Sequence, residues 1–576
     1  MTKPAPTGQF RSGSDSPSKS DAFDRSLHAA VARYTAGLSP IALSQAWWDW
    51  AAHLSSSPGR RADLLASAVT KSAAVLSGPA AGGYAEKAGQ DVRFDDDAWR
   101  TWPFSFWAAA HKAQEEWWAE AVAGLRGQSV DHEKVNAFAV RQMLDLASPS
   151  NYMATNPEVQ RQTLREAGRN LVRGGRHFLE DLEHLSSGEP APDLSAFVVG
   201  ETVAATPGDV VFRNHLIELI RYAPTTDTVH PEPILLIPAW IMKFYILDLS
   251  PHNSMVRFLV GQGHTVYCIS WRNPDAEDRD LGMDDYLSSG IMAALDAIEE
   301  DRPDTRVHAV GYCLGGTLLS IAAAAMGRDG DDRLATVSLL AAQADFTEAG
   351  ELSLFINDSQ LALLEDMMWK EGVLKAEQMA GTFQLLKSND LIWSRVLRDY
   401  MMGQRSEPND LMAWNADTTR MPYRMHSEYL RRLYLNNDLA EERLDVGGKP
   451  VALSDIRVPV FAVGTERDHV APWKSAYKIQ SMSDAEVTFA LASGGHNGGI
   501  VSEPGHPRRH FRIHTTAEHA GHVGPEEWLK LAEQRDGSWW TAWAEWLDAR
   551  SLAKIKRPVM NLASVCPAPG TYVFQD

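Results

Sequence analysis

The sequence predicts an α/β fold preceded by a mainly helical domain, and two observations lead to this. After residue 196, short apolar runs alternate with helical segments, which is typical of a parallel sheet covered by helices. Before it, Leu, Ala, Trp and charged residues recur at the spacing of an amphipathic helix. We therefore divide the chain into a disordered tail at residues 1–20, a helical N-terminal domain at 21–195 and an α/β catalytic domain at 196–576.

The helical domain is rich in aromatic side chains. Ten of them crowd its sequence: Trp47, Trp48, Trp50, Trp99, Trp102, Phe104, Phe106, Trp107, Trp117 and Trp118. We favour packing within and between the helices as the explanation, because aromatic side chains dominate core energetics. The alternative is an apolar surface for a partner subunit or a hydrophobic polymer.

Six short apolar runs predict the strands of the α/β domain. They are residues 234–237, 265–270, 307–310, 336–340, 458–463 and 487–491. The gap between the fourth and fifth runs is far longer than a crossover needs, and it contains helical patterns. Insertions of this length are usually functional, so we expect a helical cap at about residues 345–455.

The third apolar run leads into a turn that predicts catalysis. Gly311-Tyr312-Cys313-Leu314-Gly315 follows the run, and an Ala-rich helical segment follows the turn. A G-x-nucleophile-x-G turn between a strand and a helix is the nucleophile elbow of the α/β-hydrolase fold. Cys313 stands at its centre, and a thiolate is a strong nucleophile. The alternative is a small buried cysteine on an ordinary turn.

A cysteine nucleophile needs a base, and the base needs an orienting carboxylate. In α/β-hydrolases these residues follow the nucleophile in the order acid, then histidine. Asp468 follows the fifth apolar run, and His496 follows the sixth in a glycine-rich loop. Glu466 and His469 are rivals that fit the chain order less well. The sequence therefore predicts a Cys313–His496–Asp468 triad.

The same fold predicts two backbone donors for an oxyanion. One is the N–H of Leu314, directly after the nucleophile. The second comes from the loop after the first apolar run, where we expect Ala239 or Trp240, with Ile241 as an open alternative.

Composition excludes several other functions. The formal net charge of −20 argues against nucleic acid and anionic membranes as main partners. The three cysteines, Cys268, Cys313 and Cys566, form neither a disulfide framework nor a metal-ligand motif. The first twenty residues lack the apolar segment of a signal peptide, and no run predicts a transmembrane segment. We expect a cytoplasmic protein that binds no metal.

Several motifs together resemble the poly(3-hydroxyalkanoate) synthase family. Residues 236–251 resemble its P-x-W-I-N-K-[FY]-Y-I-L-D-L signature, and Gly311-Tyr-Cys-Leu-Gly-Gly316 matches its G-x-C-x-G-G box. Further similar segments are Ser148-Pro-Ser-Asn-Tyr152, Ser270-Trp-Arg-Asn-Pro-Asp275, Asn389-Asp-Leu-Ile-Trp393, Trp414-Asn-Ala-Asp-Thr-Thr419, Asp468-His-Val-Ala-Pro-Trp473 and Gly495-His496. The resemblance runs from about residue 90 to the end of the chain. Two positions depart from the family pattern. Met242 stands where the family usually has Asn, and Asn497 stands where it usually has an apolar residue.

The resemblance implies a polymerase of (R)-3-hydroxyacyl-CoA that releases CoA. Cys313 would carry the acyl chain as a thioester, His496 would deprotonate Cys313, and Asp468 would activate the 3-hydroxyl of the incoming monomer. No cofactor is implied, because coenzyme A is part of the substrate. The basic side chains Lys243 and Arg272 are nearby possibilities for contacts with CoA.

The chain length is similar to that of the long single-subunit synthases. By this resemblance we expect a homodimer at the surface of polyhydroxyalkanoate granules in the cytoplasm. Two alternatives stay open. One is a thioesterase or depolymerase of the same fold that admits water, and the other is an inactive granule-associated scaffold.

Overall fold

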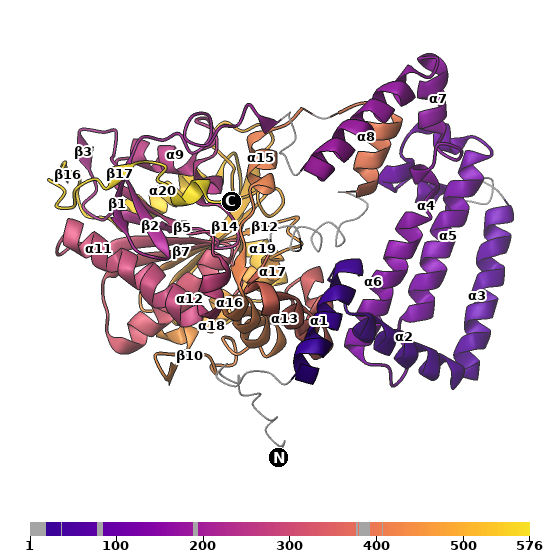
Figure 1. Ribbon diagram of the computed structural model, residues 1–576, viewed down its shortest axis with the longest axis horizontal. Coiled ribbons are helices and arrows are strands. Elements are labelled where there is room, and N and C mark those ends of the chain that lie inside the picture. The colour runs from indigo at the N-terminus through magenta and orange to yellow at the C-terminus, as the bar shows by residue number, and fades with distance from the viewer. Residues whose placement is uncertain are drawn as a thin grey trace.

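The computed structural model describes residues 19–35, 37–77, 84–187, 194–375, 378, 392–405 and 407–576. The tail predicted at residues 1–20 lies almost entirely outside these ranges, as do residues 379–391 of the predicted cap. The described chain forms a helical part and a sheet part (Figure 1).

The helical part contains the helices predicted before residue 195. They are α1 (Lys19–Tyr34), α2 (Pro40–Ser55), α3 (Pro58–Leu76), α4 (Tyr84–Ala88), α5 (Phe104–Val122), α6 (Val130–Leu146), α7 (Pro157–Arg165) and α8 (Arg169–Ser187). Local sequence determines where several of these helices begin. Pro40 occupies the first turn of α2 while the Ser39 side chain accepts from the N–H of Ala42, and Asn156 caps α7 in the same way.

The aromatic side chains of this part divide into two groups. Trp99 is buried and meets Phe94 edge-on, with ring centroids 4.9 Å apart, and Trp47 meets Trp50 similarly at 5.3 Å. Packing is therefore the correct explanation for these. It is wrong for Trp48 and Trp102, whose exposed fractions are 77% and 83%.

The sheet is the centre of the second part. Its strands are β1 (Asp209–Arg213), β2 (Ile217–Tyr222), β4 (Ile234–Ile237), β5 (Val266–Trp271), β6 (Val307–Tyr312), β7 (Leu334–Leu340), β12 (Val460–Thr465), β13 (Val487–Ala492), β14 (His510–Thr516), β15 (Glu533–Asp536) and β17 (Cys566–Pro567). Their order is β15-β14-β13-β12-β7-β6-β4-β5-β2-β1-β17. The six predicted strands are β4, β5, β6, β7, β12 and β13, and they pair in parallel with one another. This arrangement confirms the α/β-hydrolase fold.

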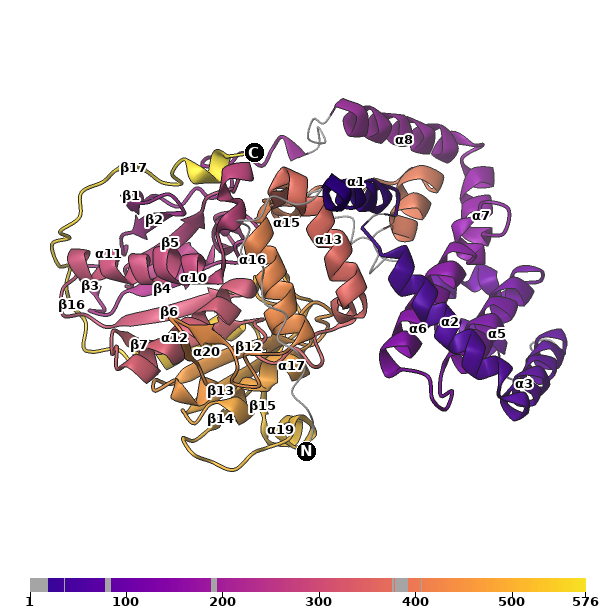
Figure 2. The same ribbon diagram turned by 60° about the horizontal axis from the view of Figure 1, so that its bottom comes forward.

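Helices cover both faces of this sheet (Figure 2). Among them are α11 (Ala293–Asp301), α12 (Leu314–Asp329) and α20 (Trp539–Asp548). The tryptophans of α20 are buried against the sheet, and the indole N–H of Trp543 donates to the Ser338 hydroxyl at 3.0 Å. The helix therefore packs on the sheet. The antiparallel strand β15 that precedes it was not predicted.

The predicted cap lies between β7 and β12. It contains α13 (Asp358–Glu371), the π-helix η11 (Val396–Met401), α15 (Asp410–Ala416), α16 (Tyr423–Glu428) and the π-helix η12 (Tyr429–Leu435). The N-terminal helices pack on it: α1 contacts α13, and α8 contacts η11. Ser39 N–H donates to Gln360 Oε1 at 2.8 Å, and Arg395 pairs with Asp181 at 2.9 Å. The helical part thus contacts the cap, which lies beside the predicted catalytic residues.

Because two histidines are buried, we expect acid to destabilise the folded protein. Burial lowers the pKa of His426 in α16 and that of His308 in β6, each to about 4. Below about pH 6.5 these two imidazoles therefore bind protons in the unfolded chain but not in the folded chain. The free energy of unfolding consequently falls as the pH drops toward 4. Each histidine contributes a slope of up to about 1.4 kcal/mol per pH unit. We expect the urea midpoint to fall between pH 7 and 5, and to fall less in His426→Leu; equal slopes would contradict the prediction.

Candidate active site

The nucleophile elbow is present in the structure. Cys313 lies between the end of β6 and the start of α12, with φ 53° and ψ −122°. A non-glycine residue adopts positive φ only at a cost, and such residues cluster at functional sites. The conformation is held because Cys313 N–H donates to Leu340 of β7, while its carbonyl accepts from Gly316 and Thr317.

The small residues around Cys313 are required by close backbone approaches. A Cβ on Gly311 would lie 2.4 Å from Cα of Gly316, so strand and helix touch at this point. A Cβ on Gly315 would lie 2.1 Å from the carbonyl oxygen of Ile237. Glycine at these positions brings the start of α12 against the end of β4.

Gly315→Ala should be strongly destabilising, because its Cβ would collide with two backbone carbonyls, those of Ile237 and Pro238. We expect a loss of about 3 kcal/mol in the free energy of unfolding, measured by urea denaturation. Gly59→Ala in α3 is the control, since a Cβ there meets nothing within 4 Å. It should be neutral or slightly stabilising, and equal losses in both variants would contradict the argument.

His496 and Asp468 are brought together at the carboxyl ends of their strands. Asp468 follows β12 and His496 follows β13, and the two strands are parallel neighbours. Nδ1 of His496 lies 2.8 Å from Oδ2 of Asp468. The Cys313 sulfur lies near the same ring, since its charge helps to raise the pKa of His496. The structure therefore brings the three predicted side chains together.

The Asp468 carboxylate is fully engaged by the protein. Oδ1 accepts from the backbone N–H groups of Val470 and Ala471, at 2.9 and 2.8 Å. Oδ2 accepts from Thr465 Oγ1 at 3.1 Å in addition to His496. The side chain has no exposed surface. It is held ready to orient the imidazole, with no face open toward a substrate.

The electrostatics of the pair follow from these contacts. Burial alone would lower the pKa of His496, but the charges of Cys313 and Asp468, with the hydrogen bond to Asp468, raise this pKa to about 10. Burial alone would raise the pKa of Asp468, but His496 and the backbone donors lower it below its usual range. The surroundings of His496 therefore favour the protonated form of its imidazole.

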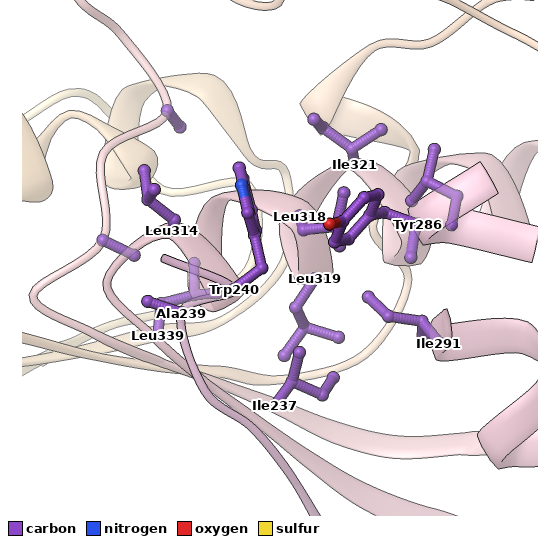
Figure 3. Packing of buried hydrophobic residues seen from close by; sticks show 14 of the residues in the cluster. Ile237, Ala239, Trp240, Tyr286, Ile291, Leu314, Leu318, Leu319, Ile321 and Leu339 are labelled. Atoms are coloured by element: carbon purple, nitrogen blue, oxygen red, sulfur yellow. The ribbon is translucent and has the colours of Figure 1, made fainter. Parts of the chain in front are cut away.

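The two segments predicted to supply the oxyanion donors adjoin each other. Leu314 is the first residue of α12, where backbone N–H groups have no partner within the helix. Ala239 and Trp240 follow β4, and Figure 3 shows them beside Leu314. The close approach of Gly315 to Ile237 and Pro238 explains why the two segments adjoin.

Aromatic side chains surround this region. Trp240 is 2% exposed, and its ring lies 5.8 Å from that of Tyr286 and 5.9 Å from that of Tyr429. Burial raises the pKa of Tyr429 and of Tyr434, and the charge of Cys313 adds to both shifts. Both tyrosines belong to η12 of the cap. The cap therefore reaches the nucleophile.

One contact beside His496 was not predicted from the sequence. The buried hydroxyl of Tyr312 donates to Asn497 Oδ1 at 2.6 Å, and the Tyr312 ring lies 5.8 Å from the His496 ring. This bond ties the histidine loop to the strand that carries Cys313. The departure of Asn497 from the usual apolar residue was the signal that could have indicated it.

The other candidates have different surroundings. Glu466 contacts His510 at 3.3 Å. Lys243 is buried and donates from Nζ to the backbone carbonyl of Gln575, and Arg272 pairs with Asp275 at 2.7 Å. Both cations proposed for CoA are therefore already paired with protein groups.

Comparison with known proteins supports the α/β-hydrolase fold. Residues 232–502 match the alpha/beta hydrolase fold model. Among solved structures, a carboxyl esterase from Bacillus coagulans is 13% identical with a TM-score of 0.32, covering 50% of this chain and 89% of its own. The match of residues 232–502, together with the order of the strands, makes the chain an α/β-hydrolase-fold protein.

Two further family models match. Residues 90–259 match the model for the N-terminus of poly-beta-hydroxybutyrate polymerase (PhaC). Residues 18–60 match a second model, described as poly-beta-hydroxybutyrate polymerase N terminal. The poly(3-hydroxyalkanoate) polymerase of Methylorubrum extorquens is 42% identical over 463 residues, covering 79% of this chain and 76% of that protein. The polymerase subunit PhaC of Rhizobium meliloti (strain 1021) is 37% identical, covering 84% and 79%. The chain belongs to the poly(3-hydroxyalkanoate) polymerase family, and it is an enzyme of that type.

Proposed function

We propose that the protein polymerises (R)-3-hydroxyacyl-CoA through an acyl thioester on Cys313, with His496 as base and Asp468 as its orienting carboxylate. The observation that carries this is the geometry at the elbow. Cys313 is held at positive φ near His496, whose Nδ1 is hydrogen-bonded at 2.8 Å to Asp468. The family relationship supplies the reaction class, and this geometry supplies residues able to perform it.

In the first step, His496 takes the proton of the Cys313 thiol, and the Cys313 sulfur forms a bond to the thioester carbonyl carbon of the substrate. The oxyanion that develops is met by backbone donors at Leu314 and at Ala239 or Trp240. The bond to the CoA sulfur then breaks, and the departing thiolate takes a proton from His496. The raised pKa of His496 keeps that proton available beside the thiolate at neutral pH.

In the second step, the 3-hydroxyl of another acyl chain attacks the Cys313 thioester. Nε2 of His496 accepts the hydroxyl proton, because Nδ1 is bonded to Asp468. The new C–O bond forms an ester, and the Cys313 thiolate is the leaving group. Exchange between thioesters is near thermoneutral, whereas forming an oxoester from a thioester is favourable, so elongation proceeds forward.

Asp468 acts through His496 in this proposal. The resemblance assigns it to direct activation of the monomer hydroxyl, but its two oxygens already accept four hydrogen bonds, and its side chain is fully buried. A substrate hydroxyl would have to displace one of these partners. We therefore favour a role in holding the imidazole tautomer and stabilising its charge.

The surroundings favour a hydroxyl of the substrate over water. Trp240, Tyr286 and Tyr429 are buried beside the elbow, and the cap lies over it. An apolar site of this kind holds few waters to compete as nucleophile. This supports transfer to an acyl chain over hydrolysis.

Two expectations about assembly belong to this proposal. We propose that the protein acts as a homodimer at the granule surface. Exposed apolar side chains on α2 and α3, including Trp48, Leu65, Val69 and Leu76, offer a surface that such contacts would cover. No helix among the described residues is long and apolar enough to cross a membrane.

The test combines CoA release with product sizing, using a short and a medium (R)-3-hydroxyacyl-CoA. We expect CoA release with a polymeric product that grows as CoA accumulates. Free hydroxy acid appearing at the rate of CoA release would instead identify a hydrolase. No CoA release above that of Cys313→Ala would identify a scaffold.

A further inference from the structure

A histidine cluster lies at the edge of the sheet opposite the active site. His230 precedes β4, His264 precedes β5, and His308 is the second residue of β6, so all three lie at the amino ends of parallel strands. Cys313 follows the carboxyl end of β6. His230 and His264 are 3% and 1% exposed, and their rings stack with centroids 4.2 Å apart and planes inclined by 15°.

Two of these imidazoles have ring nitrogens without a hydrogen-bond partner among the described residues. Within the described residues, Nδ1 of His264 and both ring nitrogens of His230 have no hydrogen-bond partner of good geometry. His308 differs, because its nitrogens lie 2.8 Å from Thr336 Oγ1 and 3.0 Å from Ser551 Oγ. Buried polar atoms without partners are rare and call for an explanation, such as a bound water or ion.

A carboxylate completes the cluster. Asp548 is the last residue of α20, and its Oδ1 lies 2.6 Å from Nε2 of His230. The contact is close but is not directed along the N–H, so it is not a hydrogen bond. The Asp548 side chain is 56% exposed, which leaves it free to change rotamer.

We propose that His230, His264 and Asp548 bind a divalent transition-metal ion, for which zinc is the best fit. Two imidazoles and a carboxylate form a ligand set that zinc accepts in proteins. One ligand atom from each residue lies within 4.8 Å of the others. Tetrahedral zinc with bonds of about 2.1 Å needs ligand atoms roughly 3.3 Å apart, so the stacked rings must tilt and Asp548 must rotate inward.

The electrostatics permit this binding at neutral pH. Burial lowers the pKa of His230, and it lowers the pKa of His264 to about 3, so both rings are neutral and keep a lone pair for a metal. Lys554 opposes a cation here, while the Glu232 carboxylate favours one.

The ion would join the end of α20 to the segments that enter β4 and β5. It would therefore stabilise the C-terminal part of the chain on the sheet without touching the acyl chemistry. Stability and metal binding are accordingly the properties to measure, and their outcome is independent of the proposed polymerase mechanism.

The experiment uses the full chain after chelator treatment, in a Cys313→Ala background that removes the reactive thiol. Co²⁺ is titrated and followed by its visible absorption, and Zn²⁺ is titrated by calorimetry and by thermal unfolding. We expect one equivalent bound and a higher melting temperature with Zn²⁺. Asp548→Asn, at an exposed position, should weaken binding at least tenfold while the protein stays folded, and His230→Gln should abolish it.

Asp49→Asn is the matched control. Asp49 lies 2.9 Å from His53 and 2.6 Å from His132, so it forms another histidine–carboxylate group, on the helical part. This variant should bind Co²⁺ and Zn²⁺ as the parent does. Absence of a stoichiometric site would overturn the proposal, as would unchanged affinity in Asp548→Asn or loss of the site in Asp49→Asn.

Discussion

Cys313→Ser should lower CoA release by at least about 10³-fold while leaving the fold intact. A hydroxyl is far less acidic than a thiol, and the serine alkoxide is a poorer leaving group when the next hydroxyl attacks. The substitution is nearly isosteric, so the strained turn and its contact with Leu340 should persist. The measurement is CoA release from a short (R)-3-hydroxyacyl-CoA, together with mass spectrometry of the acylated protein.

Cys566→Ser is the control for this substitution. Cys566 is partly buried in β17, at the far edge of the sheet from β12 and β13, and its sulfur accepts from Arg213 at 3.3 Å. That variant should keep its activity and should carry the acyl group on Cys313. Near-normal turnover by Cys313→Ser, or an acyl group found on another residue, would refute the nucleophile assignment.

The elbow and the two catalytic loops could be predicted because chain order fixes them. In a parallel sheet, residues that follow neighbouring strands meet at the same edge, so Asp468 after β12 and His496 after β13 had to lie close together. The glycines around Cys313 are equally constrained, since strand and helix touch there. Such features depend on short segments whose placement the fold dictates.

Other features depended on contacts that no local pattern reports. The helical patterns expected in the cap did not indicate where a strand or a π-helix would interrupt them. The structure has the short strand Met421–Pro422 (β9), then α16 and the π-helix η12. The Tyr312–Asn497 bond joins residues 185 apart in sequence, and the exposure of Trp48 depends on which helices surround α2. Tertiary packing decides each of these.

Asp468→Asn should lower acylation of Cys313 and chain elongation by a similar factor, of about 10⁴. The amide removes the charge that helps raise the pKa of His496, and its NH₂ group can donate to Nδ1 and hold the wrong tautomer. Both steps need the same imidazole, once to give a proton and once to accept one. Rapid-quench measurement of acyl-enzyme formation separates the first step from polymer growth.

Direct activation of the monomer hydroxyl by Asp468 predicts a different result. Acyl-enzyme formation would then stay near the wild-type rate in Asp468→Asn, and elongation alone would fail. Thr465→Val serves as the matched control, because it removes one neutral donor to Oδ2 at 3.1 Å and keeps the His496 contact. It should cost far less than Asp468→Asn in both steps. Since every hydrogen bond to the carboxylate comes from Thr465, Val470, Ala471 or His496 among the described residues, equal losses in both steps are the outcome that this geometry requires.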